Sequence, residues 1–358
     1  MARLTVWRAP IMPERDQKAV SIKTLAAHLN LSHATVSRAL NDKSTISAAT
    51  KERVRDAAAA MGYVANAGAR LVRGMRGRLV GLIIPDVQND FYSTVAKVLA
   101  HRCMQEGLQL ILAISDDDSA LEALHIRAML EARVAGIIIT PTIALQAREA
   151  TFLTTLPCVQ IIRHHELIRA PCIGVHDQQG IRLATEHLLA LGHRRIGFIG
   201  GVRALSTAVD RLSGYELALA AYNLQVSEKL IALGPPRPEF GRTAMKKLLK
   251  QRNRPAGFVM GSSQLTLGAL QAIKESGLAI PDEISIVGYG DPPWFELSAP
   301  PLTTVHLPVA DVAEAAAVGL FSQMQGRVLK NQPGPAPPLL SPCLCVRAST
   351  RLVPLKSI

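Results

Sequence analysis

Residues 25–42, LAAHLNLSHATVSRALND, predict two short helices joined by a tight turn. The first helix is expected over about Ile22–Leu29 and the second from Ser32 to about Asn41. Asn30 tolerates the left-handed conformation that a sharp turn needs. The Ser32 hydroxyl can accept a hydrogen bond from a free backbone N–H of the second helix. This pattern is typical of a helix-turn-helix.

The second helix separates an apolar side from a polar side. At about 100° per residue, one side holds Val36, Ala39 and Leu40, and the other holds His33, Ala34, Ser37, Arg38 and Asn41. The first helix offers Ile22, Leu25, Ala26 and Leu29 as its inward face. We therefore expect the two apolar faces to pack together and the polar face to be free for a partner.

A third helix follows, and Ser47 is its expected N-cap. Its inward positions are Val54, Ala57, Ala58 and Met61, and Gly62 is placed to end it. Two helices alone could form an ordinary helical hairpin, whereas three helices with a shared core predict a small domain over residues 20–65.

The positive charge of the chain is concentrated near this domain. The chain carries 40 Lys and Arg against 28 Asp and Glu, and residues 1–78 hold 14 of the basic side chains and 5 of the acidic ones. A local field of this sign favours a polyanion such as nucleic acid. The alternative is a solvated basic arm.

Composition limits the remaining classes. The five cysteines are scattered and include no CxxC pair, which favours reduced thiols in a cytoplasm over a disulfide scaffold or a zinc site. A signal peptide and a transmembrane helix are not expected, because long apolar runs are missing. We therefore predict a cytoplasmic protein with no membrane partner.

From Leu79 onward, buried apolar strands such as LVGLIIP and ISIVGYGD alternate with amphipathic helices such as QGIRLATEHLLALG. This alternation indicates parallel α/β sheets. The strands are too many for one small sheet, so we predict two Rossmann-like subdomains with a cleft between them. Ligands of such sheets bind beyond the carboxyl ends of the strands.

The run from Leu25 through S..TVSRALN to MGY..N..AR resembles the lactose/galactose repressor family, and the resemblance extends over about Val20–Leu352. It implies a helix-turn-helix domain followed by a periplasmic-binding-protein-like domain whose two subdomains are connected by three crossings of the chain. The implied function is a transcriptional regulator, most simply a repressor, that acts as a homodimer on a near-palindromic operator.

The resemblance implies that the second helix reads base edges, and Arg38 suits this role because Arg bonds bidentately to guanine. Residues 66–78 correspond to a hinge whose helices pair in the minor groove of DNA. Val72 stands at the usual wedge position of Leu, and Gly68 disfavours a helix there. The expected DNA contacts are Ser21, Ser32, His33, Ala34, Thr35, Ser37, Arg38, Asn41, Asn66, Arg70, Leu71 and Val72.

The resemblance also implies a small sugar or sugar-acid effector in the cleft. Arg211 matches the ligand-binding arginine of the family, and Phe91 and Tyr92 match its aromatic pair. Sequence departures such as Ser262-Ser263 and Gly290 suggest few carboxylates, so that Arg203 and Arg211 face little opposing charge and a sugar acid is favoured. The expected effector contacts are Phe91, Tyr92, Arg203, Thr207, Arg211, Ser262, Asp291 and Trp294.

No convincing catalytic set, metal site or cofactor motif is found in the sequence. The alternative function is a sugar-binding protein or a sugar-metabolising enzyme with an incidental basic N-terminus. The predicted organisation is an extension at 1–19, the DNA-binding domain at 20–65, the hinge at 66–78, the ligand-binding and dimerisation domain at 79–352, and a tail at 353–358.

Overall fold

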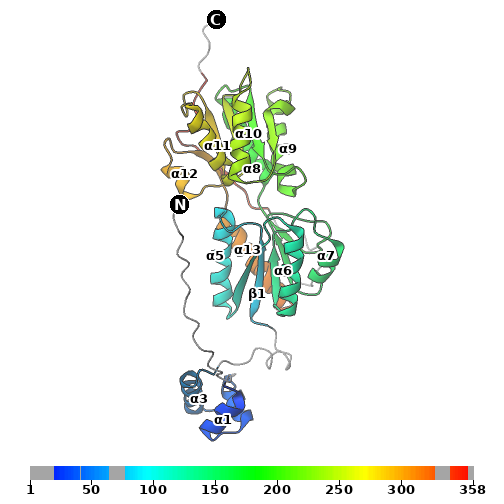
Figure 1. Ribbon diagram of the computed structural model, residues 1–358, viewed down its shortest axis with the longest axis vertical. Coiled ribbons are helices and arrows are strands. Elements are labelled where there is room, and N and C mark those ends of the chain that lie inside the picture. Colours follow the sequence, from blue (N-terminus) through cyan, green and yellow to red (C-terminus); the bar gives the residue numbers. More distant parts are fainter. Residues whose placement is uncertain (1–19, 41, 64–76, 327–338, 354–358) are drawn as a thin grey trace, which may run out of the picture. The chain divides into compact units, whose positions relative to one another are not determined.

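The computed structural model describes residues 20–40, 42–63, 77–326 and 339–353. The chain divides into two compact units between Met75 and Arg76. The first unit is helical, and the second contains two β-sheets with helices on both faces (Figure 1).

Three helices form the first unit, and each begins at the same kind of cap. The serine hydroxyl accepts a hydrogen bond from the backbone N–H of the threonine three residues on, at 3.1 Å for Ser21, 3.0 Å for Ser32 and 3.3 Å for Ser47. A capped N-terminus satisfies one of the free N–H groups of the first turn. The helices are α1 (Ile22–Leu29), α2 (His33–Leu40) and α3 (Ala48–Ala60).

The turn between α1 and α2 has the expected geometry. Asn30 adopts φ 54° and ψ 41°, a left-handed conformation that ends α1. The apolar faces then meet in a small core built around the fully buried Leu25, Val36, Ala39 and Val54. The helix-turn-helix and its third helix are therefore confirmed.

The second unit contains two sheets of mainly parallel strands. The first sheet has the order β2-β1-β3-β4-β5 and the second has the order β11-β10-β9-β8-β6-β7, with β11 as the antiparallel edge strand. The strands are β1 (Leu79–Ile84), β2 (Gln109–Ile114), β3 (Gly136–Ile139), β4 (Cys158–Ile161), β5 (Cys172–Ile173), β6 (Ile196–Gly200), β7 (Ile231–Leu233), β8 (Gly257–Met260), β9 (Ser285–Tyr289), β10 (Thr303–His306) and β11 (Cys343–Cys345).

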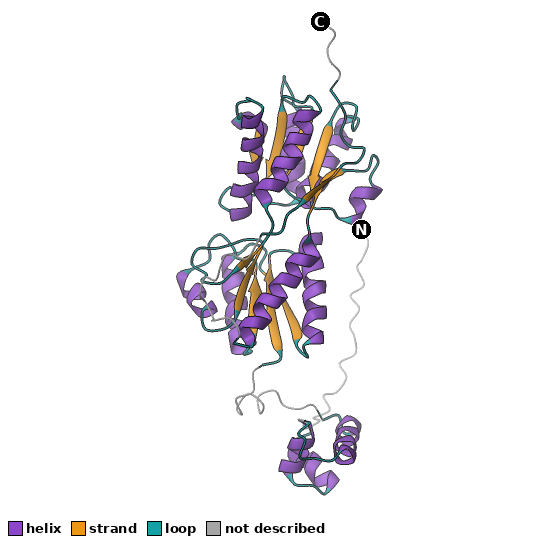
Figure 2. Ribbon diagram, turned by 180° about the vertical axis from the view of Figure 1, so that it is seen from behind, coloured by secondary structure: helices purple, strands orange, loops and turns teal. Residues whose placement is uncertain are grey.

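Helices cover both faces of each sheet (Figures 1 and 2). Alternate residues of β1 face opposite layers: Leu82 packs in the cluster of α5 and α13, and Ile83 packs in that of α6 and α7. On the second sheet, α8 and α9 cover one face, and α10 and α11 cover the other. The helices are α5 (Asp90–Gln105), α6 (Ser119–Glu131), α7 (Ala147–Leu153), α8 (Asp177–Ala190), α9 (Ser206–Ala221), α10 (Pro238–Leu249), α11 (Ser263–Ser276), α12 (Pro293–Leu297) and α13 (Val309–Met324).

The chain passes between the two sheets near residues 174–176 and again near 307–308, because β5 and α13 pack with the first sheet while α8 and β10 pack with the second. After α13 it returns to the second sheet at β11. Near the first crossing, Leu340 N donates to Gly174 O at 3.0 Å and His176 N donates to Leu340 O at 2.9 Å. The predicted pair of α/β subdomains is therefore confirmed.

Candidate functional site

Helix α2 presents a polar surface on the first unit. Ser32, His33, Ala34 and Arg38 are exposed, and Thr35 is half-buried. The Arg38 guanidinium makes no ion pair or hydrogen bond with another described residue, so it is available to a partner. An exposed arginine on the second helix of a helix-turn-helix is placed as a base reader would be.

Ser37 differs from the expectation, because it is only 7% exposed. Its position on α2 is one step from the fully buried Val36 and three steps from the half-buried Leu40, so the buried side of this helix is wider than the apolar pattern alone indicates. The prediction that Ser37 faces outward with Arg38 is therefore wrong in this structure.

The other cations of this unit are partly engaged. Lys51 and Arg55 both pair with Asp42, at 3.0 and 3.1 Å, and the hydrogen bond from Lys51 lowers the pKa of that carboxyl below its usual value. Arg53 donates to the backbone oxygen of Leu29 at 2.8 Å, which ties α3 to the end of α1. These three side chains stabilise the arrangement of the helices.

The remaining predicted DNA contacts are of two kinds. The Ser21 and Ser32 hydroxyls serve as helix caps and stay exposed. The others lie outside the described residues, namely Asn41, Asn66, Arg70, Leu71 and Val72.

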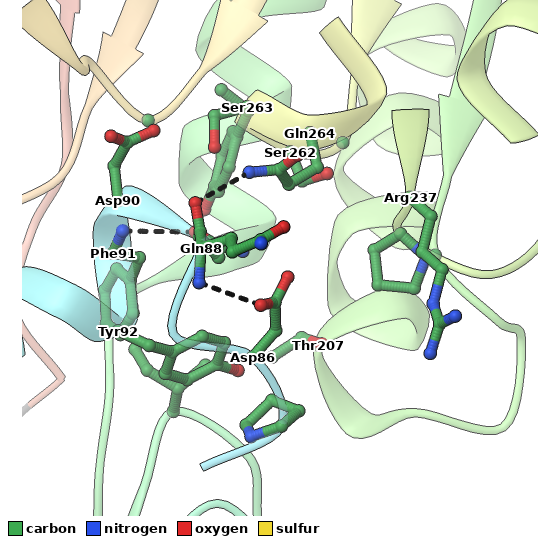
Figure 3. Close-up of a pocket in the computed structure, with 18 of the residues that line it drawn as sticks. Asp86, Gln88, Asp90, Phe91, Tyr92, Thr207, Arg237, Ser262, Ser263 and Gln264 are labelled. Atoms are coloured by element: carbon green, nitrogen blue, oxygen red, sulfur yellow. Dashed lines mark hydrogen bonds between the residues drawn. The ribbon is translucent and has the colours of Figure 1, made fainter. Parts of the chain in front are cut away.

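A cavity of about 1610 Å³ lies in the second unit, where the carboxyl ends of strands from both sheets meet. We call it the cleft. Its lining comes from the segments after β1, β2 and β4 of the first sheet and from those after β6, β7, β8, β9 and β10 of the second. Figure 3 shows side chains of both sheets directed into one space. This is the expected position for a ligand of parallel sheets.

Arg211 of α9 anchors the floor of the cleft. Its Nε donates to Asp177 Oδ1 at 2.8 Å, its Nη1 donates to Gly261 O at 2.7 Å, and its guanidinium carbon lies 4.4 Å from the centre of the Tyr289 ring. Tyr289 also donates its hydroxyl hydrogen to Asp177. Burial, followed by the charge of Asp177, raises the pKa of Tyr289 well above its ordinary value.

Arg163, which follows β4, is a cleft residue that the sequence did not suggest. It is buried and pairs with Asp117 of the loop after β2. Arg163 lies two residues after β4 and Asp117 three residues after β2, so their positions near strand ends are the signal that could have found them. Asp118 caps α6 by accepting from Ala120 N at 2.7 Å, whereas its neighbour Asp117 binds Arg163.

Six of the eight predicted effector contacts line the cleft: Phe91, Tyr92, Thr207, Arg211, Ser262 and Asp291. Phe91 and Tyr92 meet edge to face with ring centres 5.3 Å apart. Asp291 does not offer a free carboxylate, since Arg347 binds both of its oxygens at 2.8 and 2.9 Å.

Two of the predicted contacts lie elsewhere. Arg203 is exposed outside the cleft lining and pairs with Glu228 at 3.7 Å. Trp294 packs edge to face on Phe295 at the start of α12, beside the core of α10 and α11. The expectation of two arginines with little opposing charge is therefore wrong, because Arg203 is absent from the cleft and Arg211 is neutralised by Asp177.

A metal site and a membrane-spanning helix each set requirements on the described residues. Among them, no group of three or more His, Cys, Asp or Glu side chains is arranged to hold a metal ion, and the adjacent His164, His165 and Glu166 border a smaller cavity of about 390 Å³. No helix within the described ranges combines the length and the apolar character that a membrane span requires.

A helix-turn-helix unit joined to a ligand-binding cleft of two α/β subdomains defines a DNA-binding regulatory protein. Residues 21–66 match the family of bacterial regulatory proteins called the lacI family, and residues 185–350 match the periplasmic binding protein-like domain. The first unit therefore carries a lacI-family DNA-binding domain, and the chain is a DNA-binding transcriptional regulator. The alternative of a sugar-binding protein or enzyme with an incidental basic N-terminus is disfavoured by this match.

Relatives and solved structures agree with the assignment. The chain is 29% identical over 296 residues to the transcriptional regulator DegA of Bacillus subtilis, covering 82% of this chain and 88% of that protein. It is 29% identical over 298 residues to the regulator GalR of Escherichia coli, covering 83% and 87%. A crystal structure of the Lac repressor dimer bound to operator and the anti-inducer ONPF superposes with a TM-score of 0.80 at 26% identity, over 93% of this chain and 100% of that one.

Proposed function

We propose that this protein is a dimeric repressor whose affinity for a near-palindromic operator is controlled by a small polyhydroxy compound bound in the cleft. The observation that carries the proposal is the cleft itself, a large cavity lined by polar and apolar side chains of both sheets, in a chain that also has a helix-turn-helix. Because its target is chromosomal DNA, it acts in the cytoplasm.

The operator side of the proposal rests on α2. Two copies of this helix, one from each protomer, would occupy two half-sites about one helical turn of DNA apart. The similar Lac repressor structure is a dimer bound to operator, which supports the same assembly here. Arg38 is the residue we assign to base reading, with His33 and Ala34 beside it on the exposed surface.

The effector side rests on groups in the cleft that remain free for a ligand. Arg211 uses Nε and Nη1 within the protein, and its Nη2 has no hydrogen-bond partner among the described residues. Phe91 adds an aromatic surface that suits the C–H face of a sugar. A structure of the regulator CelR in complex with cellobiose is similar to this chain, with a TM-score of 0.70 at 25% identity.

The mechanism is a population shift between two relative orientations of the subdomains. The effector contacts both sheets at once, so it binds the two orientations with different affinity and moves the equilibrium toward the better one. The ligand is bound and released without chemical change, so we expect to recover it intact after incubation with the protein.

The test uses an operator selected from random duplexes and a panel of neutral pentoses, hexoses and disaccharides. We expect at least one compound to change operator affinity by tenfold or more. In Arg211→Lys, a cation still faces Asp177 but the planar fork is lost, so operator binding without effector stays and the response weakens. Arg203→Lys is the matched control outside the cleft and should respond like the wild type. Equal responses of both variants would remove Arg211 from the site.

A further inference from the structure

The cleft carries an excess of carboxylates whose charges are not matched. Eight Asp and Glu side chains line it, against three arginines. Two of the arginines, Arg163 and Arg211, are each held by a carboxylate of the protein. The third, Arg237, donates to the backbone oxygen of Asp116 at 3.5 Å and forms no ion pair with a described residue.

Asp86, two residues after the end of β1, is the carboxylate of the lining on which the inference rests. It is half-buried, and it accepts a hydrogen bond from the backbone N–H of Gln88 at 2.8 Å. No Lys, Arg or His among the described residues lies within 4 Å of its oxygens. Figure 3 shows its carboxylate in the middle of the lining residues.

Two hydroxyls of the second sheet add an independent sign of a ligand. Thr207 is 6% exposed and Ser263 is 7% exposed, and both line the cleft. Neither hydroxyl makes a hydrogen bond with another described residue, and neither oxygen belongs to the fully buried unpaired atoms, so both are accessible from the cleft. They can accept hydrogen bonds from a ligand that also contacts Asp86.

We propose that the effector carries a protonated amine and that Asp86 is its counter-ion; this deepens, and rests on, the proposed function. A neutral sugar can donate hydroxyl hydrogen bonds to the Asp86 carboxylate but brings no opposing charge, so closure of the cleft around it leaves the charge of Asp86 unbalanced. An ammonium group supplies the missing charge and three N–H donors. A ligand carboxylate would instead meet the acidic side chains of the lining, of which only Asp117 and Asp291 are paired with an arginine among the described residues, so a sugar acid is disfavoured.

The first experiment compares compounds that differ only in charge. Glucosamine, glucose and glucuronate form one set, and galactosamine, galactose and galacturonate form a second. Dissociation constants and the effect on operator affinity are measured with the full-length protein. We expect the amine of at least one set to bind at least tenfold more tightly than the neutral sugar, and the acid to bind most weakly. Neutral or acidic members that bind as well as the amines would overturn the inference.

The second experiment removes the charge of Asp86. Asp86→Asn keeps an oxygen for the Gln88 N–H, so we expect a folded protein with unchanged operator binding in the absence of ligand. Its affinity for the amine should fall to that for the neutral sugar. Asp90→Asn is the matched control, because Asp90 also lines the cleft but lies in the first turn of α5, away from Asp86 in Figure 3.

The outcomes separate this inference from the proposed function. If Asp86→Asn keeps the full preference for amines, or loses no more than Asp90→Asn does, Asp86 is not the counter-ion. If neutral sugars change operator affinity and amines do not, the repressor function stands and the amine is wrong. If none of the six compounds binds while a compound of the neutral panel changes operator affinity, the amine is wrong and the proposed function stands; if no compound of either set acts, the effector part of the proposed function fails.

Discussion

The reading helix α2 and the cleft use arginine in opposite ways. On α2, Arg38 is exposed and its guanidinium has no partner among the described residues, so its binding capacity is kept for another molecule. In the cleft, Arg163 is buried, Arg211 has 15% of its side chain exposed, and each is paired with a carboxylate of the protein. The first kind of arginine contributes to recognition, whereas the second mainly positions its neighbours and leaves one or two donors for a ligand.

This difference predicts where a substitution acts. Removing an exposed cation deletes a contact with the partner and leaves the fold intact. Removing one member of a buried pair leaves an uncompensated charge, which costs much more than the pair contributes. Substitutions of the paired charges in the cleft should therefore lower stability, whereas substitution of Arg38 on α2 should weaken DNA recognition.

The largest effect is expected for Asp177→Ala. This residue is 4% exposed and holds both Arg211 and Tyr289, so its removal leaves a buried guanidinium without a counter-ion. We expect the free energy of unfolding of the second unit to fall by about 3–5 kcal/mol. Urea denaturation followed by far-UV circular dichroism measures the change.

The exposed pair provides the control. Glu228→Ala breaks the contact with Arg203, whose side chain is 63% exposed, and should change stability by no more than about 0.5 kcal/mol. A loss of similar size in both variants would show that the buried pair has no special role.

Arg38→Ala should weaken recognition without a loss of stability. The expected cost is about 1–3 kcal/mol of discrimination at one base pair of each half-site. Binding is measured against a panel of single-base operator variants. Ser37→Ala, at the adjacent and buried position, should keep the wild-type ranking of bases. If Ser37→Ala changes the ranking and Arg38→Ala does not, the assignment of the exposed surface is reversed.

A smaller effect is expected at the start of the same helix. Ser32→Ala removes the hydroxyl that accepts from Thr35 N and should destabilise the first unit by about 1 kcal/mol. Thermal unfolding of the first unit is the measurement. Ser32→Asp retains an acceptor and should restore most of the stability, so equal losses in both variants would argue against a capping role.

The helical unit was largely predictable because its determinants are local. Ser32, Asn30 and Ser47 act within four residues of their own positions, and the helix bounds follow from them. The width of the buried side of α2 is the exception, because Ser37 is only 7% exposed although it lies outside the apolar pattern of this helix.

The cleft was only partly predictable because its pairs join distant segments. The family resemblance suggested Arg211, and the segments after strands suggested Thr207 and Ser262, yet the partner of Arg211 lies 34 positions away in α8 and that of Arg163 lies 46 positions away. The spacing of apolar residues in the sequence does not indicate which distant charged residues will pair. Arg203 and Trp294 follow strands as well, but local packing turns them elsewhere.

The crossings between the two sheets have a mechanical consequence. The first crossing, at residues 174–176, is joined to the segment that precedes β11, because Leu340 is hydrogen-bonded to both Gly174 and His176. A single bridge between Val175 and Leu340 therefore ties the two segments to each other. The crossing at 307–308 adds a further attachment between the sheets. We therefore expect any relative motion of the subdomains to bend these connections together, so that a small ligand acts on all of them at once.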